Sequence, residues 1–238
     1  LLQGRMAVDH GSSARYRELL AFLRAHTFSD GALYDSLGQL MDIQNFRDFQ
    51  VAQIYTGNID YMGNIRYWQS DDVSSQFRWI MYDTDLGFGH GVPARWNFIA
   101  ERLSPRQTKW YNRTWSTFIL RKLMENTSFK HEFINQVCYA MSTAFSSENA
   151  NRLIDSLADT YRPEMARHFK RNGGSVERWE RAVQSLRDFA NDRPAFYLKH
   201  AGQFFTLNNP YTLHLAVDNQ EHGTVTINKN VFADSAII

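Results

Sequence analysis

The chain has 238 residues, a length typical of one domain with or without a small appendage. Its hydrophobic share of 43% and charged share of 21% are those of a folded globular protein and exclude a disordered chain. The net charge of +1 excludes a general electrostatic attraction to nucleic acid or to membrane lipid, so we expect no nucleic-acid partner.

No apolar run reaches the roughly 20 residues that a membrane-spanning helix needs, and we expect no membrane span in this chain. Cys138 is the only cysteine, so no disulfide can form within the chain. Its apolar neighbours Phe133, Val137 and Met141 predict a thiol in the core. The opening "LLQGRMAVDHGSS" has neither a start methionine nor a signal peptide, and we expect a piece of a longer protein.

The first part of the chain predicts three helices. Apolar residues spaced three and four apart occur at positions 16 to 23 and again at positions 33 to 40. A third helix carries the apolar residues of positions 46 to 55, and Gly57 is expected to end it. The segment "GNIDYMGNIRYW", residues 57 to 68, then follows as a loop that runs into a strand.

Two strand-like runs, residues 65 to 68 and 77 to 82, are separated by a polar turn and predict a β-hairpin. From Trp115 on, long helical patterns dominate, with a break at "NGGS", residues 172 to 175. Pro194 is expected to begin a last helix. The predicted fold class is therefore α+β and mostly α-helical.

The composition shifts near Asn208, which predicts a domain of residues 1–207 and an appended piece of residues 208–238. Alternating apolar residues at positions 211 to 217, a glycine-containing turn, and then Val225 and Ile227 predict a second, C-terminal β-hairpin. The stretch "GTVTIN" is similar to the start of a β-rich repeat of bacterial surface proteins. That resemblance implies an extracytoplasmic protein, either secreted or at the cell surface.

Two acidic residues, Asp83 and Asp85 in "MYDTDLGFG", stand where the second strand of the first hairpin ends. Residues two apart in a strand point to the same side, so both carboxylates are expected to face one cation. Such hard oxygen ligands suit Mg²⁺ or Ca²⁺. A polar turn without metal is the alternative. An EF-hand loop is excluded, because its sixth and twelfth positions would be Phe88 and Ala94.

A second polar cluster, Asn58, Asp60 and Asn64, precedes the hairpin. In phosphoryl transfer by protein kinases, an aspartate orients the acceptor hydroxyl, and an asparagine a few residues later holds a metal. Asp60 stands 23 residues (83 minus 60) ahead of Asp83, and the order of loop, two strands and metal aspartate is that of a kinase. Asn and Asp also crowd ordinary turns, so a plain turn is again the alternative.

On these residues the chain resembles the spore coat protein H (CotH) kinase family, from about residue 13 to about residue 206. The resemblance rests on "GNIDYMGNIRYW", "RWIMYDTDLGFG" and the helical segments "ENTSFKHEFI", "RPEMARHFKR" and "VERWERAVQSLRDFANDRP". It implies the large lobe of an atypical protein-kinase-like enzyme. Such an enzyme transfers phosphate from ATP to Ser or Thr of a protein substrate, with Mg²⁺ or Mn²⁺.

The resemblance also implies roles for individual residues. Asp60 takes the catalytic-loop position, and Asn64 takes the position of the metal-binding asparagine. Asp83 takes the position of the metal-binding aspartate of the kinase Asp-Phe-Gly motif, and Asp85 is a supporting metal ligand. The interval from Asp60 to Asn64 is one residue shorter than in ordinary protein kinases.

Two further residues, Asn58 and Arg78, are assigned to cofactor binding. Arg78 flanks the metal-bearing strand and would reach phosphate, and a surface salt bridge is the alternative.

No glycine-rich loop on a strand pair and no Val-Ala-Ile-Lys-like strand precedes Asp60. We therefore expect the small kinase lobe to be missing, and this chain alone to hold ATP poorly and to be incomplete as an enzyme. Two other functions stay open. One is a non-catalytic pseudokinase or binding module of a surface protein, and the other is metal-dependent hydrolysis of phosphoesters by the same acids.

Overall fold

The computed structural model describes residues 1–29, 31–72, 74–106, 109–208, 213–215, 225–227, 230–232 and 236–237. The chain divides into two units, which are described separately below. Unit 1 comprises residues 1–87 and 97–137, and unit 2 comprises residues 88–96 and 138–238. The chain therefore leaves unit 1 after Gly87 and returns to it at Asn97.

Unit 1 contains a small antiparallel sheet with the strand order β2-β1-β3-β4. Its strands are β1 (Leu2–Gln3), β2 (Ala7–Val8), β3 (Arg66–Trp68) and β4 (Arg78–Ile80). Strands β3 and β4 pair with Tyr67 opposite Trp79, which confirms the first predicted hairpin. The sequence did not reveal β1 and β2, because a strand of two residues is too short to show alternation.

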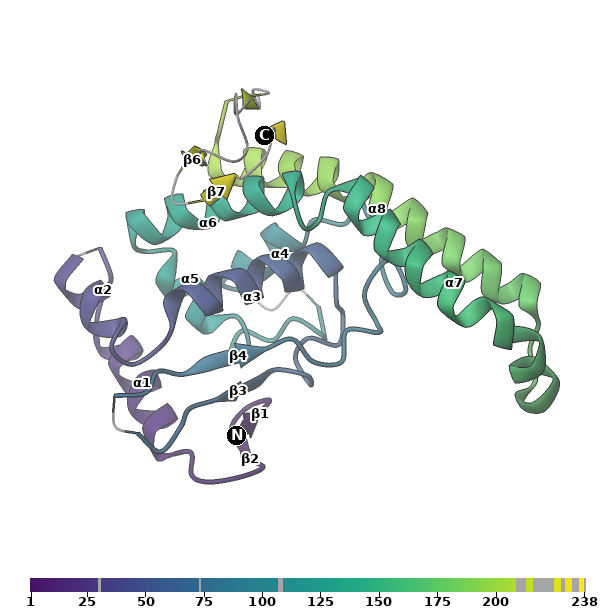
Figure 1. Ribbon diagram of the computed structural model, residues 1–238. Helices are drawn as coiled ribbons and strands as arrows, with labels where there is room; N and C mark the ends of the chain where they lie inside the picture. The colour runs from purple at the N-terminus through teal and green to yellow at the C-terminus, as the bar shows by residue number, and fades with distance from the viewer. Residues whose placement is uncertain are drawn as a thin grey trace. The chain divides into compact units, whose positions relative to one another are not determined.

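One face of the β3–β4 hairpin packs against helix α3 (Ile43–Thr56), as Figure 1 shows. Tyr67 and Trp79 are buried on this face, whereas Trp68 and Ile80 are exposed. Helix α3 contributes Phe46, whose ring centroid lies 4.6 Å from that of Trp79. The alternation that predicted the hairpin therefore places its aromatic side against the helix that leads into the candidate loop.

The other helices of unit 1 are α1 (Ala14–Ala25), α2 (Gly31–Leu37), α4 (Phe98–Leu103), α5 (Phe118–Leu123) and most of α6 (Thr127–Ser142). Helix α3 begins after Asp42, whose side chain accepts a hydrogen bond from the backbone N–H of Asn45. It ends at Gly57, which has a φ of 64°, so the predicted stop is confirmed. Helix α4 was not predicted, because six residues hold too little apolar periodicity.

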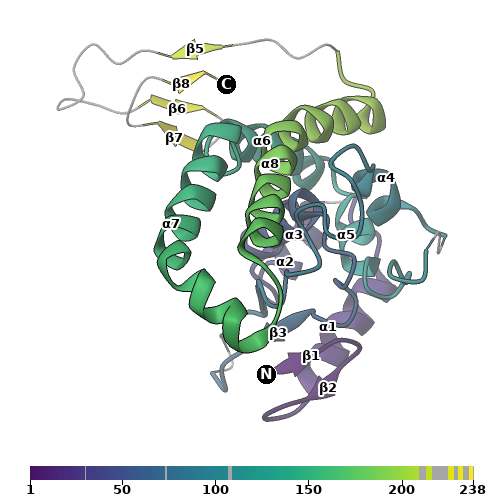
Figure 2. The same cartoon turned by 90° about the vertical axis from the view of Figure 1, so that its right-hand side faces the viewer.

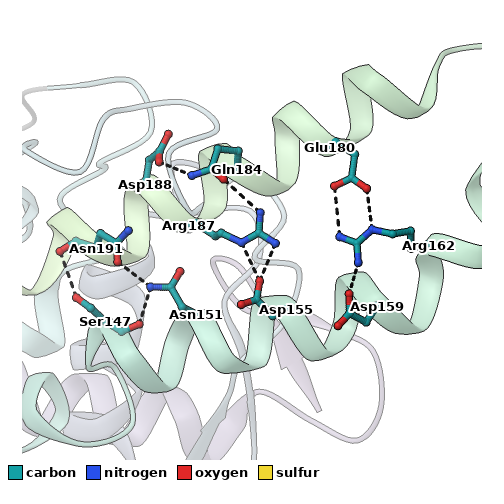
Figure 3. Close-up of polar contacts among 10 residues, drawn as sticks. All are labelled: Ser147, Asn151, Asp155, Asp159, Arg162, Glu180, Gln184, Arg187, Asp188 and Asn191. Carbon is teal, nitrogen blue, oxygen red and sulfur yellow. Dashed lines mark hydrogen bonds and ion pairs between the residues drawn. The ribbon is translucent and has the colours of Figure 1, made fainter.

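Unit 2 is built on two long helices, α7 (Ser147–Asn172) and α8 (Val176–Phe205). Figures 1 and 2 show them running side by side, and the turn between them contains Gly173 and Gly174 with φ of 80° and 106°. A ladder of polar contacts joins the two helices (Figure 3), in which Arg187 donates to Asp155 over 2.7 Å and Arg162 to Glu180 over 2.7 Å. The predicted break at residues 172 to 175 is confirmed.

The prediction that Pro194 begins a last helix is wrong, because α8 continues through Pro194 without interruption. Proline has no N–H and leaves the carbonyl four residues earlier, that of Ala190, without its helical partner. The Ser147 hydroxyl donates to this carbonyl over 3.0 Å and also lies 3.2 Å from the carbonyl of Asn191. A side chain of α7 thus replaces the bond that proline removes.

The predicted burial of Cys138 is also wrong. Cys138 is exposed on α6, whereas the adjacent Val137 is fully buried. Consecutive residues of a helix point about 100° apart, so apolar neighbours in sequence do not place a residue in the core.

No described helix is long and apolar enough to cross a membrane.

The C-terminal strands pair differently from the prediction. Strand β6 (Val225–Ile227) pairs with β7 (Asn230–Phe232), and β5 (His214–Leu215) pairs with β8 (Ala236–Ile237). The expected pairing of residues 211 to 217 with Val225 and Ile227 is therefore wrong in its described part. Strand β6 thus pairs with the strand that follows it in the sequence and not with β5. The domain boundary near Asn208 stays a prediction.

Candidate active site

The two loops that carry the candidate residues lie together in unit 1, and the side chain of Asn58 joins them. Asn58 is fully buried. Its Oδ1 accepts a hydrogen bond from the backbone N–H of Asp60 over 2.9 Å. Its Nδ2 donates to the backbone carbonyl of Asp83 over 3.3 Å. One amide therefore connects the loop after α3 with the loop after β4.

The first loop is a tight turn that sets Asp60 against Asn64. The backbone N–H of Gly63 donates to the carbonyl of Asp60 over 3.2 Å, and that of Asn64 donates to Tyr61 over 3.2 Å. Within this turn, Asn64 Nδ2 donates to Asp60 Oδ2 over 2.9 Å. The amide group of Asn64 thereby directs its nitrogen at the carboxylate and keeps its oxygen for another partner.

The second loop begins earlier than the sequence indicates. Strand β4 ends at Ile80, and Asp83 has a φ of 50°, in the left-handed region that Asp and Asn enter more readily than most residues. The two acids are therefore not brought together by strand alternation, as expected, but by the turn of the loop. Asp83 and Asp85 are both exposed.

Two other acids, Asp85 and Asp60, influence the pKa of Asp83. The pKa of Asp83 is raised, first by a hydrogen bond between its carboxyl group and that of Asp85. Partial desolvation and repulsion from Asp85 and Asp60 raise this pKa further, while Arg66 lowers it. An added positive charge would relieve this repulsion.

The loop after Asp85 is packed tightly against the end of α3, and Gly87 makes this possible. A Cβ at Gly87 would lie 2.9 Å from the carbonyl oxygen of Thr56 and 3.0 Å from that of Thr84, so a side chain would clash with backbone. The N–H of Ile59 also faces the carbonyl of Leu86 at 3.4 Å. The glycine of the Asp-x-Asp-x-Gly pattern thus keeps the two loops close.

A buried arginine, Arg102 of α4, lies against the first loop and was not found from the sequence. It is 1% exposed, and its Nη2 donates to the backbone carbonyl of Asn58 over 3.0 Å. Its guanidinium carbon lies 3.8 Å from the ring centroid of Tyr61. Burial lowers the pKa of Arg102 to about 10, so it stays charged near neutral pH. In the sequence, the apolar neighbours Phe98, Ile99 and Leu103 could have indicated that this arginine is buried.

Arg66 of β3 is the second cation that the sequence did not single out. Its Nη1 pairs with Asp9 over 2.9 Å, and its guanidinium carbon lies 4.6 Å from the ring centroid of Tyr82. It is the positive group that lowers the pKa of Asp83. Alternation in "IRYW" places Arg66 on the strand face opposite Tyr67, and this pattern could have identified it.

The guanidinium of Arg78 forms an ion pair with Asp42 over 3.0 Å. This pair is the surface salt bridge that the sequence left open, and phosphate binding by Arg78 stays a prediction. Asn58 uses its buried amide on backbone groups, so any influence on a cofactor would act through the two loops. Among the described residues, no group of three or more His, Cys, Asp or Glu residues is arranged to hold a metal ion.

A family model described as "CotH kinase protein" matches residues 3–197. That match covers most of the chain and includes both candidate loops and all of α7. No curated protein and no solved structure matches the chain.

Proposed function

Because this chain belongs to the CotH kinase protein family, we propose that it takes part in the transfer of a phosphoryl group from ATP to Ser or Thr of a protein. Kinase-like activity follows from the family. The donor, the acceptor and the need for Mg²⁺ or Mn²⁺ are our inference. The observation that carries it is the double hydrogen bond of Asn58, which holds the loop of Asp60 against the loop of Asp83.

Residues of both loops suit a divalent cation. Asp83 and Asp85 supply neighbouring carboxylates, and Asn64 keeps an amide oxygen for a ligand. Mg²⁺ prefers oxygen ligands, and it usually binds one or two carboxylates of a protein while it retains several water molecules. A third acid in the same cluster is therefore not required for binding. When bound, such a cation would neutralise negative charge on the phosphates of the nucleotide.

Asp60 is proposed to orient the acceptor hydroxyl and to receive its proton. Its Oδ2 is held by Asn64 Nδ2 and its backbone N–H by Asn58, which leaves Oδ1 for the substrate. Phosphoryl transfer depends mainly on positioning and on charge neutralisation, and a carboxylate fixed in this way meets the first need.

The proposal is tested by incubating the full-length protein with ATP labelled at the γ-phosphate, with Mg²⁺ or Mn²⁺, and measuring label on the protein itself and on added Ser/Thr-containing proteins. We expect Asp83→Asn and Asp60→Asn to reduce labelling to background. Asp71→Asn changes the charge equally at an exposed position of the hairpin turn and serves as the control. Undiminished labelling in Asp83→Asn would contradict the metal assignment.

The same samples distinguish the two other functions. A non-catalytic module would give no label in any sample. If such a module still bound nucleotide, nucleotide at 100 times Kd would raise its free energy of unfolding by about 2.7 kcal/mol. Phosphoester hydrolysis would release free phosphate that depends on Asp83, without label on any protein. Either outcome would replace the kinase proposal.

A further inference from the structure

A second candidate binding site lies in unit 1, in a cavity of about 260 Å³ that contains none of the residues discussed above as catalytic or metal-binding. Helix α1 lines it with Tyr16, Leu20 and Arg24, which are four residues apart and share one helix face. The turn between β1 and β2 contributes Arg5, and the segment around α5 contributes Trp115 and Arg121 among others.

The charge of this cavity is positive. Arg5, Arg24 and Arg121 line it, and among its described lining residues there is no Asp or Glu. Arg121 donates to the carbonyl of Thr114 over 2.8 Å and to the Thr117 hydroxyl, which orients its guanidinium and leaves three of its five N–H donors. In the described part of the chain, neither Arg5 nor Arg24 forms an ion pair with a carboxylate.

The described lining also contains four aromatic residues, which are Tyr16, Tyr67, Trp115 and Phe118. Tyr16 and Tyr67 lie with ring centroids 4.2 Å apart, and the guanidinium of Arg24 lies 5.6 Å from the ring centroid of Phe118. Burial raises the pKa of both tyrosine hydroxyls above the ordinary value, so they stay neutral at physiological pH. No negative group of the wall therefore competes with a ligand for the three arginines.

We propose that this cavity binds a phosphomonoester carried on an aromatic ring. Three guanidinium groups favour a dianion over a carboxylate, because planar forks of N–H donors match phosphate oxygens. Trp115 and Phe118, which line the cavity and are partly exposed, supply flat apolar area for the group that carries the phosphate. The ligand would be either a phosphotyrosine side chain of a protein or a free aryl phosphate. The inference does not depend on the proposed phosphoryl transfer.

Binding is tested by calorimetry on the whole chain with phenyl phosphate, methyl phosphate and phenol. We expect phenyl phosphate to bind at least tenfold more tightly than methyl phosphate, because only the first also uses the rings, and phenol to bind undetectably. Affinity should fall as salt concentration rises. Equal affinity for the two phosphates, or no binding of phenyl phosphate at millimolar concentration, would overturn the proposal.

The site is located with Arg24→Gln and Arg5→Gln, which we expect to weaken phenyl phosphate binding about tenfold each. Both arginines are exposed, so these variants should fold. Arg17→Gln removes the same charge from the same helix outside the cavity, and it should bind as the wild type does. Asp83→Asn should also bind normally. If Arg24→Gln and Arg17→Gln lose affinity equally, the cavity is not the site.

The source of the phosphate is distinguished by comparing free phosphotyrosine with a short peptide that contains it. Tighter binding of the peptide supports a protein ligand, because flanking residues then add contacts. Equal binding supports a small aryl phosphate. Failure of both to displace phenyl phosphate would contradict the proposal.

Discussion

At the scale of single residues, Asn58 is the side chain on which the geometry of the candidate site depends most directly. Its amide bonds to backbone groups of both loops, and its own carbonyl accepts from the buried Arg102. Asp60 and Asp83 are the residues proposed to act in the reaction, but the loops are joined by hydrogen bonds of Asn58 and of backbone groups. The loops would therefore separate more readily on loss of Asn58 than on loss of either acid.

Replacement of Asn58 by Ala is expected to lower the free energy of unfolding by about 1 to 3 kcal/mol, because two hydrogen bonds of about 0.5 to 1.5 kcal/mol each are lost. Urea denaturation measures this value. Asn64→Ala is the matched control in the same loop, and it should cost less than about 1 kcal/mol because Asn64 is partly exposed and the change removes one side-chain hydrogen bond, to Asp60. Equal losses in the two variants would show that Asn58 does not join the loops.

Replacement of Asp83, unlike that of Asn58, is expected to stabilise the folded chain at neutral pH. Its pKa is raised in the folded chain, so its contribution to stability is present at low pH and is lost as pH rises through the folded pKa. Asp83→Asn removes the repulsion between Asp83 and the carboxylates of Asp85 and Asp60. Asparagine also tolerates the backbone φ of 50° at this position. We expect a higher Tm for this variant at pH 7 without divalent cation.

Mg²⁺ or Mn²⁺ should raise the Tm of the wild type and not that of Asp83→Asn, as thermal denaturation with and without cation would measure. Asp71→Asn is the control and should behave as the wild type does. If Asp83→Asn is less stable than the wild type without metal, then Asp83 stabilises a polar turn, which is the alternative left open by the sequence.

At the scale of elements, α7 and α8 stabilise each other at the position of a proline. Pro194 lies inside α8, and the carbonyl that it leaves free accepts from Ser147. Figure 3 shows Ser147 at one end of the polar ladder between the two helices. The helix therefore passes through Pro194 because a neighbouring helix supplies the missing donor.

A double-mutant cycle tests this compensation. Ser147→Ala is expected to cost about 1 kcal/mol in the wild type. In the Pro194→Ala background the same change should cost only a few tenths of a kcal/mol, because the substituted residue then has a backbone N–H that donates to the carbonyl of Ala190. Urea denaturation of the four proteins gives the coupling energy. A cost of Ser147→Ala that is the same in both backgrounds would mean that the hydroxyl does not replace the lost bond.

The elements that the sequence predicted are those with enough residues to show a period. Helix α3 and the β3–β4 hairpin are examples, since Phe46 and Phe49 are three residues apart, and Phe77 and Trp79, like Ile65 and Tyr67, are two residues apart. Strand β1 and helix α4 are too short for this. Continuity through Pro194 depends on a residue 47 positions away (194 minus 147), so no local pattern contains it.

The candidate site was likewise predictable from the sequence in some features and not in others. The order of Asp60, hairpin and Asp83 is visible along the chain, and the structure brings these loops together through Asn58. The reason for the closeness of Asp83 and Asp85 was not predictable, because it comes from a left-handed backbone beyond the strand. The contact of Arg102 with the first loop depends on the fold of a segment 44 residues later than Asn58.

At the scale of the whole molecule, the stretch directly after the second loop belongs to unit 2. Residues 88–96 follow Gly87 and are held by α8. Arg193 is 1% exposed, and its Nη1 donates to the carbonyls of Ala94 over 2.7 Å and Trp96 over 2.9 Å. The rings of Phe88 and Phe189 lie with centroids 5.3 Å apart. One buried arginine thus anchors the chain between its exit from unit 1 and its return.

Arg193→Met keeps much of the side-chain volume and removes both donors. Bonds from a charged donor contribute about 1.5 to 3 kcal/mol each, so the loss of two is expected to lower the free energy of unfolding by about 3 to 6 kcal/mol and to speed amide hydrogen exchange in residues 88–96. Hydrogen exchange followed by mass spectrometry resolves this segment. Arg178→Met, an exposed arginine of the same helix, should change neither quantity. If exchange in residues 88–96 is unchanged in Arg193→Met, α8 does not hold the segment through this arginine, and Phe189 remains as its contact with the helix.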